Sequence, residues 1–230
     1  MTEGSSRAGV VPGVRTGPHQ GQPVLSAGAP LDSASAAMLM VHGRGASARD
    51  ILTLTGALDV SRFACLAPQA SGNTWYPNSF LSPIATNEPG ITSGLAAIAD
   101  VLAIVSRAGI PFERVMMLGF SQGACLSLEY SARNARRYGG IACLSGGLIG
   151  PDGAPRDYPG DFEATPIFMG CSDVDSHIPA ARVNESALIL ERMGAHVTKR
   201  LYPGMGHLVN DEEIAAVASM MDGILETREV

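Results

Sequence analysis

The sequence predicts a single α/β domain, in which a mostly parallel sheet is covered by helices on both faces. Three observations support this prediction. The chain has 230 residues, which is within the size range of one domain. Apolar residues make up 46% of it and charged residues only 17%, so a sheet can be buried on both faces. Short apolar runs alternate with stretches of helical periodicity, as in parallel sheets with crossover helices.

The expected elements begin after a polar N-terminal stretch. Residues 1–21 are rich in glycine, serine and proline without periodicity, which predicts a disordered extension and a domain spanning 22–230. The expected strands are 23–28, 36–41, 63–68, 115–118, 140–147, 166–171 and 196–202. The expected helices are 50–58, 91–108, 124–130, 179–193 and 211–225.

Charge and composition argue against several classes of protein. The net charge of -6 and the lack of Lys/Arg clusters argue against nucleic-acid binding. The apolar stretches are too short and interrupted to span a bilayer, and the N-terminus lacks a secretory signal pattern. The four cysteines lack Cys-x-x-Cys spacing, so we expect buried free thiols and no metal. A cytoplasmic protein without stable membrane insertion is expected.

The motif Gly-Phe-Ser-Gln-Gly at 119–123 marks the candidate reaction centre. It follows a buried strand at 115–118 and precedes a stretch with helix spacing. Gly-x-Ser-x-Gly at a junction of strand and helix is typical of a nucleophile elbow, where a tight turn exposes the serine above the sheet. Ser121 is therefore the candidate nucleophile.

A serine nucleophile needs a base and an acid, which follow it along the chain in this kind of fold. His207 lies in a glycine-rich loop just past the strand 196–202, and it is the candidate base. Asp173 and Asp175 both follow the strand 166–171. We favour Asp175 as the acid and keep Asp173 as the alternative; the aspartate that is not used is expected to cap the helix that begins near Pro179.

The reaction also needs backbone donors for the negative oxygen that develops on the substrate. One expected donor is the amide of Gln122, directly after the nucleophile. The other is the amide of Arg44, because the glycines on either side of it allow the backbone to turn toward the site.

Taken together, these motifs resemble the phospholipase/carboxylesterase family of α/β-hydrolases, which includes bacterial carboxylesterases and acyl-protein thioesterases. The motifs that carry the resemblance are His-Gly-Arg-Gly at 42–45, Trp-Tyr-Pro at 75–77, Gly-Phe-Ser-Gln-Gly at 119–123, Asp-Ser-His-Ile-Pro at 175–179 and Gly-Met-Gly-His at 204–207. They cover the chain from about residue 24 to its end.

The resemblance implies an α/β-hydrolase fold and a triad of Ser121, Asp175 and His207, with Arg44 and Gln122 as the oxyanion hole. It implies that Trp75 lines the acyl or alcohol pocket, although a packing role suits this tryptophan equally well. It also implies that no cofactor is needed, that the partner is a small-molecule ester, and that a homodimer can form.

The chain departs from the family pattern at two places. Arg44 stands where the family commonly has leucine, which favours an acidic or carbonyl-bearing substrate. The acid loop between Gly170 and Pro179 is two residues longer than the family's, which keeps Asp173 and Asp175 both open. The loop 148–165 is too short for a cap domain, so we expect an open site for short or flexible acyl chains.

We therefore expect a serine hydrolase that cleaves carboxylic esters through an acyl-serine intermediate. Thioesters and lysophospholipids are further candidate substrates. Two alternatives are a carbon-carbon bond hydrolase of ring-cleavage products, with Arg44 binding a carboxylate, and a non-catalytic ligand-binding homologue.

Overall fold

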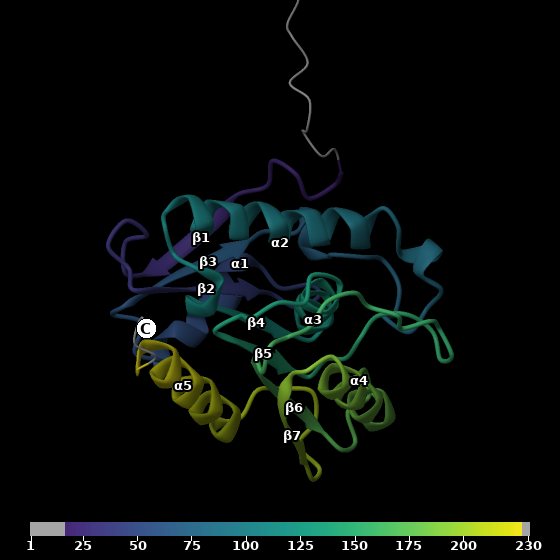
Figure 1. The fold of residues 1–230 in the computed structure, drawn as a ribbon. Helices are drawn as coiled ribbons and strands as arrows, with labels where there is room; N and C mark the ends of the chain where they lie inside the picture. Colours follow the sequence, from purple (N-terminus) through teal and green to yellow (C-terminus); the bar gives the residue numbers. More distant parts are fainter. Residues whose placement is uncertain (1–16, 227–230) are drawn as a thin grey trace, which may run out of the picture.

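A seven-stranded sheet forms the centre of the computed structural model, which describes residues 17–226 (Figure 1). The strand order is β1-β3-β2-β4-β5-β6-β7, and every pairing is parallel except that of β1 with β3. The strands are β1 (Val24–Gly28), β2 (Ala36–Val41), β3 (Phe63–Pro68), β4 (Val115–Phe120), β5 (Gly140–Leu144), β6 (Pro166–Ser172) and β7 (His196–Tyr202). The predicted mostly parallel α/β fold is confirmed.

Helices cover both faces of the sheet, as predicted. They are α1 (Ala48–Leu52), α2 (Gly90–Arg107), α3 (Gln122–Arg133), α4 (Ala180–Arg192) and α5 (Asp211–Glu226). Helices α2, α3 and α4 lie on one face and share one apolar core, whereas α1 and α5 pack into a second core on the other face (Figure 1). Short 3-10 helices lie at Thr53–Ala57, Ser71–Asn73, Ile84–Asn87 and Phe112–Arg114.

The central strands are apolar throughout because both of their faces are covered. In β2 all six side chains are buried; Leu39 packs into the core of α2 and α3, and Met38 and Met40 pack into the core of α1 and α5. The carboxyl ends of the parallel strands therefore meet at one edge of the sheet, where loops can combine their side chains into a site.

The first helix is shorter than predicted. It ends at Leu52 and continues as a 3-10 helix to Ala57, instead of running as one helix over 50–58. The hydroxyls of Thr53 and Thr55 donate to the backbone carbonyls of Asp50 and Leu52, each at 2.7 Å. Such local bonds compete with regular helix geometry, which explains the difference.

The end of the predicted N-terminal extension packs on the domain. Residues 1–16 of this extension lie outside the described residues, but 17–21 are described. His19 is only 4% exposed; its Nε2 lies 2.8 Å from the carbonyl of Trp75, and its amide donates to Ser93 Oγ at 2.9 Å. The described end of the extension therefore packs against the domain.

Two further predictions concern the cysteines and the apolar stretches of the chain. All four cysteines are buried and free, as expected. Within residues 17–226, α2 is the one helix long and apolar enough to cross a bilayer, but 56% of it is buried inside the protein. Its buried side packs into the core that it shares with α3 and α4.

Candidate active site

Ser121 lies at a strained turn between β4 and α3. Its backbone has φ 55° and ψ -118°, a conformation that costs energy for any residue with a side chain. A Cβ atom at Gly119 would lie 2.4 Å from the carbonyl oxygen of Gly123, and one at Gly123 would lie 2.1 Å from that of Val41. Both positions therefore require glycine. The motif thus has the predicted elbow geometry, which lifts the serine away from the sheet.

His207 and Asp175 form a chain of hydrogen bonds with this serine. His207 lies on the loop between β7 and α5, and its Nε2 is 2.8 Å from Ser121 Oγ. Its Nδ1 is 2.7 Å from Oδ2 of Asp175, which lies on the loop after β6. The carboxyl of Asp175 is buried, whereas the imidazole keeps 20% of its surface exposed. Three loops at the carboxyl ends of β4, β6 and β7 thus bring these side chains together.

The protonation of Asp175 determines which way these bonds run. Burial alone would raise the pKa of its carboxyl, but bonds from His207 and from the amides of His177 and Ile178 outweigh this and lower the pKa. An ionised carboxylate can only accept, so Nδ1 of His207 must carry the proton. Nε2 is then free to accept the hydroxyl proton of Ser121.

Asp173 has a different role from Asp175. Its Oδ1 accepts the amide of Gly204 at 2.8 Å, and its own amide donates to the carbonyl of Tyr202 at 3.1 Å. It therefore joins the acid loop to the loop that carries His207. It does not cap α4, as was expected of the unused aspartate, because that helix starts after Pro179 without a side-chain cap.

Arg44 and Gln122 line one cavity with Ser121, and their side chains support its wall. This cavity has a volume of about 440 Å³. Gln122 Oε1 accepts the amide of Trp75 at 2.8 Å, and its Nε2 donates to the carbonyl of Tyr76 at 2.7 Å. Arg44 donates to the carbonyls of Pro77 and Asn78 at 2.7 and 2.5 Å. The segment 75–78 is therefore held by the two residues expected to supply oxyanion-hole amides. The sequence did not predict that these two side chains hold the segment.

Trp75 does not line the cavity, so the pocket role implied by the resemblance is wrong and the packing role holds. Its side chain has no exposed surface, and its Nε1 donates to the carbonyl of His42 at 2.9 Å. Its ring lies 5.1 Å from the ring of His19 and 5.0 Å from that of His42. These polar contacts hold the indole under the site. The next residue, Tyr76, lines the cavity instead.

Several other residues that line the cavity were not predicted. Its apolar wall includes Phe80 and Cys125, and His177 lies at its mouth with its ring 4.8 Å from that of His207. The sequence offered a signal for His177, which belongs to the acid-loop motif. Phe80 and Cys125 are brought to the site by long-range packing.

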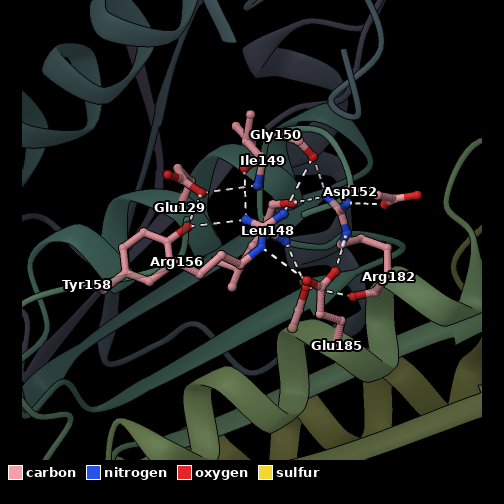
Figure 2. A network of polar contacts seen from close by, with 10 residues as sticks. Glu129, Leu148, Ile149, Gly150, Asp152, Arg156, Tyr158, Arg182 and Glu185 are labelled. Atoms are coloured by element: carbon pink, nitrogen blue, oxygen red, sulfur yellow. Dashed lines mark hydrogen bonds and ion pairs between the residues drawn. The ribbon is translucent and has the colours of Figure 1, made fainter. Parts of the chain in front are cut away.

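Buried charges fix the loop beside the cavity (Figure 2). Glu129 accepts the amide of Ile149 at 3.1 Å, and Arg182 donates to the carbonyl of Leu148 at 3.0 Å. The amide of Gly150 then donates to the carbonyl of Phe80 at 2.8 Å. Because this loop is tied to the body of the protein, the apolar wall at Phe80 has a fixed position.

No metal site accompanies this arrangement in the part of the chain that the structure describes. Between residues 17 and 226, no group of three or more His, Cys, Asp or Glu side chains could hold a metal ion.

Comparisons with known proteins agree with this geometry. A sequence model of the family described as phospholipase/carboxylesterase matches residues 25–224. A solved phospholipase/carboxylesterase from Dyadobacter fermentans is 44% identical, with a TM-score of 0.84 over 89% of this chain and 97% of that one.

Curated relatives include acyl-protein thioesterase 1 of two fungi. The Neurospora crassa protein is 31% identical over 59% of this chain, which spans 56% of that relative's length. The Debaryomyces hansenii protein is 25% identical over 89% of this chain and 97% of its own length. With a family match over most of its residues, the chain belongs to the phospholipase/carboxylesterase family of α/β-hydrolases.

Proposed function

We propose that this protein is a serine carboxylesterase that cleaves esters, and also thioesters, through an acyl-serine intermediate. The observation that carries the proposal is a pair of hydrogen bonds at a strained elbow: His207 Nδ1 donates to Asp175 at 2.7 Å, and the Ser121 hydroxyl donates to His207 Nε2 at 2.8 Å. The thioesterase and carboxylesterase relatives support the same class of reaction.

In the proposed mechanism, Ser121 Oγ attacks the ester carbonyl while His207 Nε2 takes its proton. Asp175 holds Nδ1 and stabilises the imidazolium that forms. The imidazolium then protonates the leaving alcohol or thiol, and the acyl group stays on the serine. Water, deprotonated by His207, releases the carboxylic acid and frees the enzyme. The amides of Arg44 and Gln122 would bind the oxyanion, and each such donor contributes about 100- to 1000-fold in rate.

The size and lining of the cavity support short substrates. The cavity has a volume of about 440 Å³, and polar groups line it around the serine. Phe80 and Ile178 form part of its apolar side. We therefore propose small-molecule esters with short acyl chains, without a cofactor. The free thiols suit a reducing compartment, so the cytoplasm is part of the proposal. A homodimer stays a prediction.

The function is tested with p-nitrophenyl acetate and butyrate. Ser121→Ala should lower kcat by about 10⁴-fold or more, because the nucleophile is lost. Asp175→Asn should lower it by about 10³- to 10⁴-fold, because the imidazole would take the wrong tautomer. Asp173→Asn is the matched control and should cost less than about 10-fold. Thermal unfolding of each variant checks that it folds. Full turnover by Ser121→Ala would contradict the proposal. A wild type that is inert toward these esters and toward acyl thioesters would favour a ligand-binding homologue.

A carbon-carbon bond hydrolase remains a second candidate because Arg44 lines the cavity. Its guanidinium could bind the carboxylate of a ring-cleavage product, and the same three residues could serve the cleavage. Loss of absorbance with dienoic keto acids at a higher kcat/KM than that for p-nitrophenyl butyrate would favour this candidate. No absorbance change would exclude it.

A further inference from the structure

The active-site cavity contains a cation that is fixed in place but not neutralised. Two nitrogens of the Arg44 guanidinium donate to the carbonyls of Pro77 and Asn78. These carbonyls are neutral groups, so they orient the guanidinium without cancelling its charge. An arginine side chain has five N–H donors, and these two bonds leave three of them available.

No acidic side chain opposes this charge inside the cavity. In the described part of the chain, neither an aspartate nor a glutamate lines the cavity, and Arg44 makes no ion pair. Asp175 lies behind His207 and is already bonded to it and to two amides. The other polar groups at the mouth of the cavity are those of Asn78, Ser79 and His177, which can donate hydrogen bonds.

A guanidinium held in this way is suited to bind an anion. Its planar fork matches the two oxygens of a carboxylate, and the bonds it already makes reduce the entropy lost on binding. Because Arg44 is exposed at the mouth, its attraction for an anion should weaken as salt is added.

We propose that Arg44 forms an anion subsite of the active centre and that the preferred substrates are esters carrying a second, carboxylate group. This inference rests on the proposed esterase function. The Arg44 subsite concerns which substrates are preferred, namely anionic ones, whereas the triad determines the type of reaction. The carboxylate belongs to the acyl or to the alcohol part of the ester, and the experiment distinguishes the two.

Matched pairs of alkyl esters, followed by pH-stat titration, test the subsite. On the acyl side the pairs are monomethyl succinate with methyl butyrate and monomethyl glutarate with methyl pentanoate. On the alcohol side the pair is 3-acetoxypropanoate with propyl acetate. The wild type should prefer the anionic member of at least one pair by about 10-fold or more in kcat/KM, since a charge-assisted bond contributes on this scale. Raising the salt from 0.05 to 0.5 M should reduce this preference.

The decisive comparison is the ratio of the two kcat/KM values in Arg44→Met and in Arg44→Lys. The ratio is used because Arg44 also holds the segment 77–78 and supplies an amide, so absolute rates will change. Arg44→Met should lose the preference, and Arg44→Lys should retain part of it. Arg49→Met is the matched control, because this exposed arginine is nearby in the sequence but does not line the cavity, and its ratio should equal that of the wild type.

Two results would overturn the subsite. One is equal or better turnover of the neutral ester by the wild type in all three pairs. The other is an unchanged ratio in Arg44→Met. In either case neutral esters would still be cleaved in a Ser121-dependent way, so the proposed function would stand. Turnover that does not depend on Ser121 would instead contradict the function itself.

Discussion

Glu129 and Glu213 are both buried carboxylates on helices that pack against the sheet, but their surroundings are opposite. Glu129 on α3 is 1% exposed and Glu213 on α5 is 0% exposed. Each lies close to the candidate site: Glu129 holds the loop behind Phe80, and Glu213 lies in the first turn of the helix that follows His207. Comparing them shows that the hydrogen-bond partners of a buried carboxylate, and not its burial alone, determine its pKa and its effect on stability.

Glu129 has partners for both oxygens. Oε1 accepts Nε of Arg133 at 2.7 Å, and Oε2 accepts the hydroxyl of Tyr158 at 2.9 Å and the amide of Ile149. Arg156 donates to the carbonyl of Ile149 at 2.9 Å and so completes the network around the same loop (Figure 2). A charge with this many donors stabilises the fold as long as all of them are kept.

Glu213 has a partner for only one oxygen. Oε2 accepts the amide of Asn210 at 3.0 Å, and Asn210 Oδ1 accepts the amide of Glu213 at 2.8 Å. Among the described residues Oε1 has no hydrogen-bond partner, and it lies 2.2 Å from the position that a Cβ of Gly170 would take. Burial therefore raises the pKa of Glu213 to about 7, although the Asn210 amide acts to lower it. At neutral pH this carboxyl is close to the point where it changes charge.

The largest expected effect is that of removing the well-paired carboxylate. Glu129→Ala should lower the free energy of unfolding by about 3 kcal/mol, because a buried amide and a hydroxyl lose their acceptor together. Urea unfolding at pH 7 measures this change.

A half-exposed member of the same network is the control for that variant. Glu185, with 41% of its side chain exposed, pairs with Arg156 and Arg182. Glu185→Gln should cost less than about 1 kcal/mol, because solvent screens its charge. If the two variants lost the same free energy of unfolding, the burial of Glu129 would make no contribution to stability.

The second effect is that Glu213→Gln should stabilise the folded protein, by an amount that depends on pH. The folded protein holds this proton up to about pH 7, whereas the unfolded chain loses it near 4.5. Stability therefore falls as pH rises through this window and then stays lower. At about 1.4 kcal/mol per pH unit, the full loss over this window of about 2.5 units is at most about 3.5 kcal/mol.

Glu213→Gln cannot ionise, so it should be more stable than the wild type by about 1–3 kcal/mol at pH 8 and no more stable at pH 4. Thermal and urea unfolding at the two pH values measure this difference. A variant that is less stable than the wild type at pH 8 would show that the ionised carboxylate has partners after all. Glu212→Gln, on the exposed side of the same helical turn, should show no such pH dependence.

The third effect is the steric coupling of Glu213 to Gly170. A Cβ at Gly170 would lie 2.2 Å from Glu213 Oε1, so Gly170→Ala should cost about 1–3 kcal/mol. In a Glu213→Ala background the cost should fall by at least about 0.5 kcal/mol, as measured by a double-mutant cycle.

The control glycine for this cycle is on α5 itself. A Cβ at Gly223 would meet nothing within 4 Å. Gly223→Ala should therefore stabilise the protein, by up to about 1 kcal/mol, through the helix preference of alanine. If the stability losses of Gly170→Ala and Glu213→Ala were additive in the double variant, the two residues would not be coupled.

The sequence predicted the parts of the site that depend on short motifs. The sheet, the elbow at Ser121 and the order of serine, acid and histidine are readable from apolar runs and glycine spacing over a few residues. The choice between Asp173 and Asp175 was left open, because it depends on which carboxylate the loop turns toward His207. That turn is set by the amides of His177 and Ile178, which sequence spacing does not reveal.

The parts that could not be predicted depend on contacts between residues far apart in the chain. For Trp75 the sequence left a pocket role and a packing role equally open, and its bond to the His42 carbonyl and its contact with His19 decide for packing. Glu129 and Arg156 have no motif that announces them, because their partners lie in a loop and a helix brought together only by folding. Burial of a charged side chain with such partners is a tertiary property.

The most direct test of the central claim is the mass of the protein during turnover. Rapid quenching after mixing with p-nitrophenyl butyrate, followed by intact-mass and peptide analysis, should show one butyryl group added, located on Ser121. The adduct should be absent from Ser121→Ala and should accumulate in a variant with slowed deacylation. An adduct on another residue, or Ser121-dependent turnover with no acylated protein at any quench time, would contradict an acyl-serine mechanism.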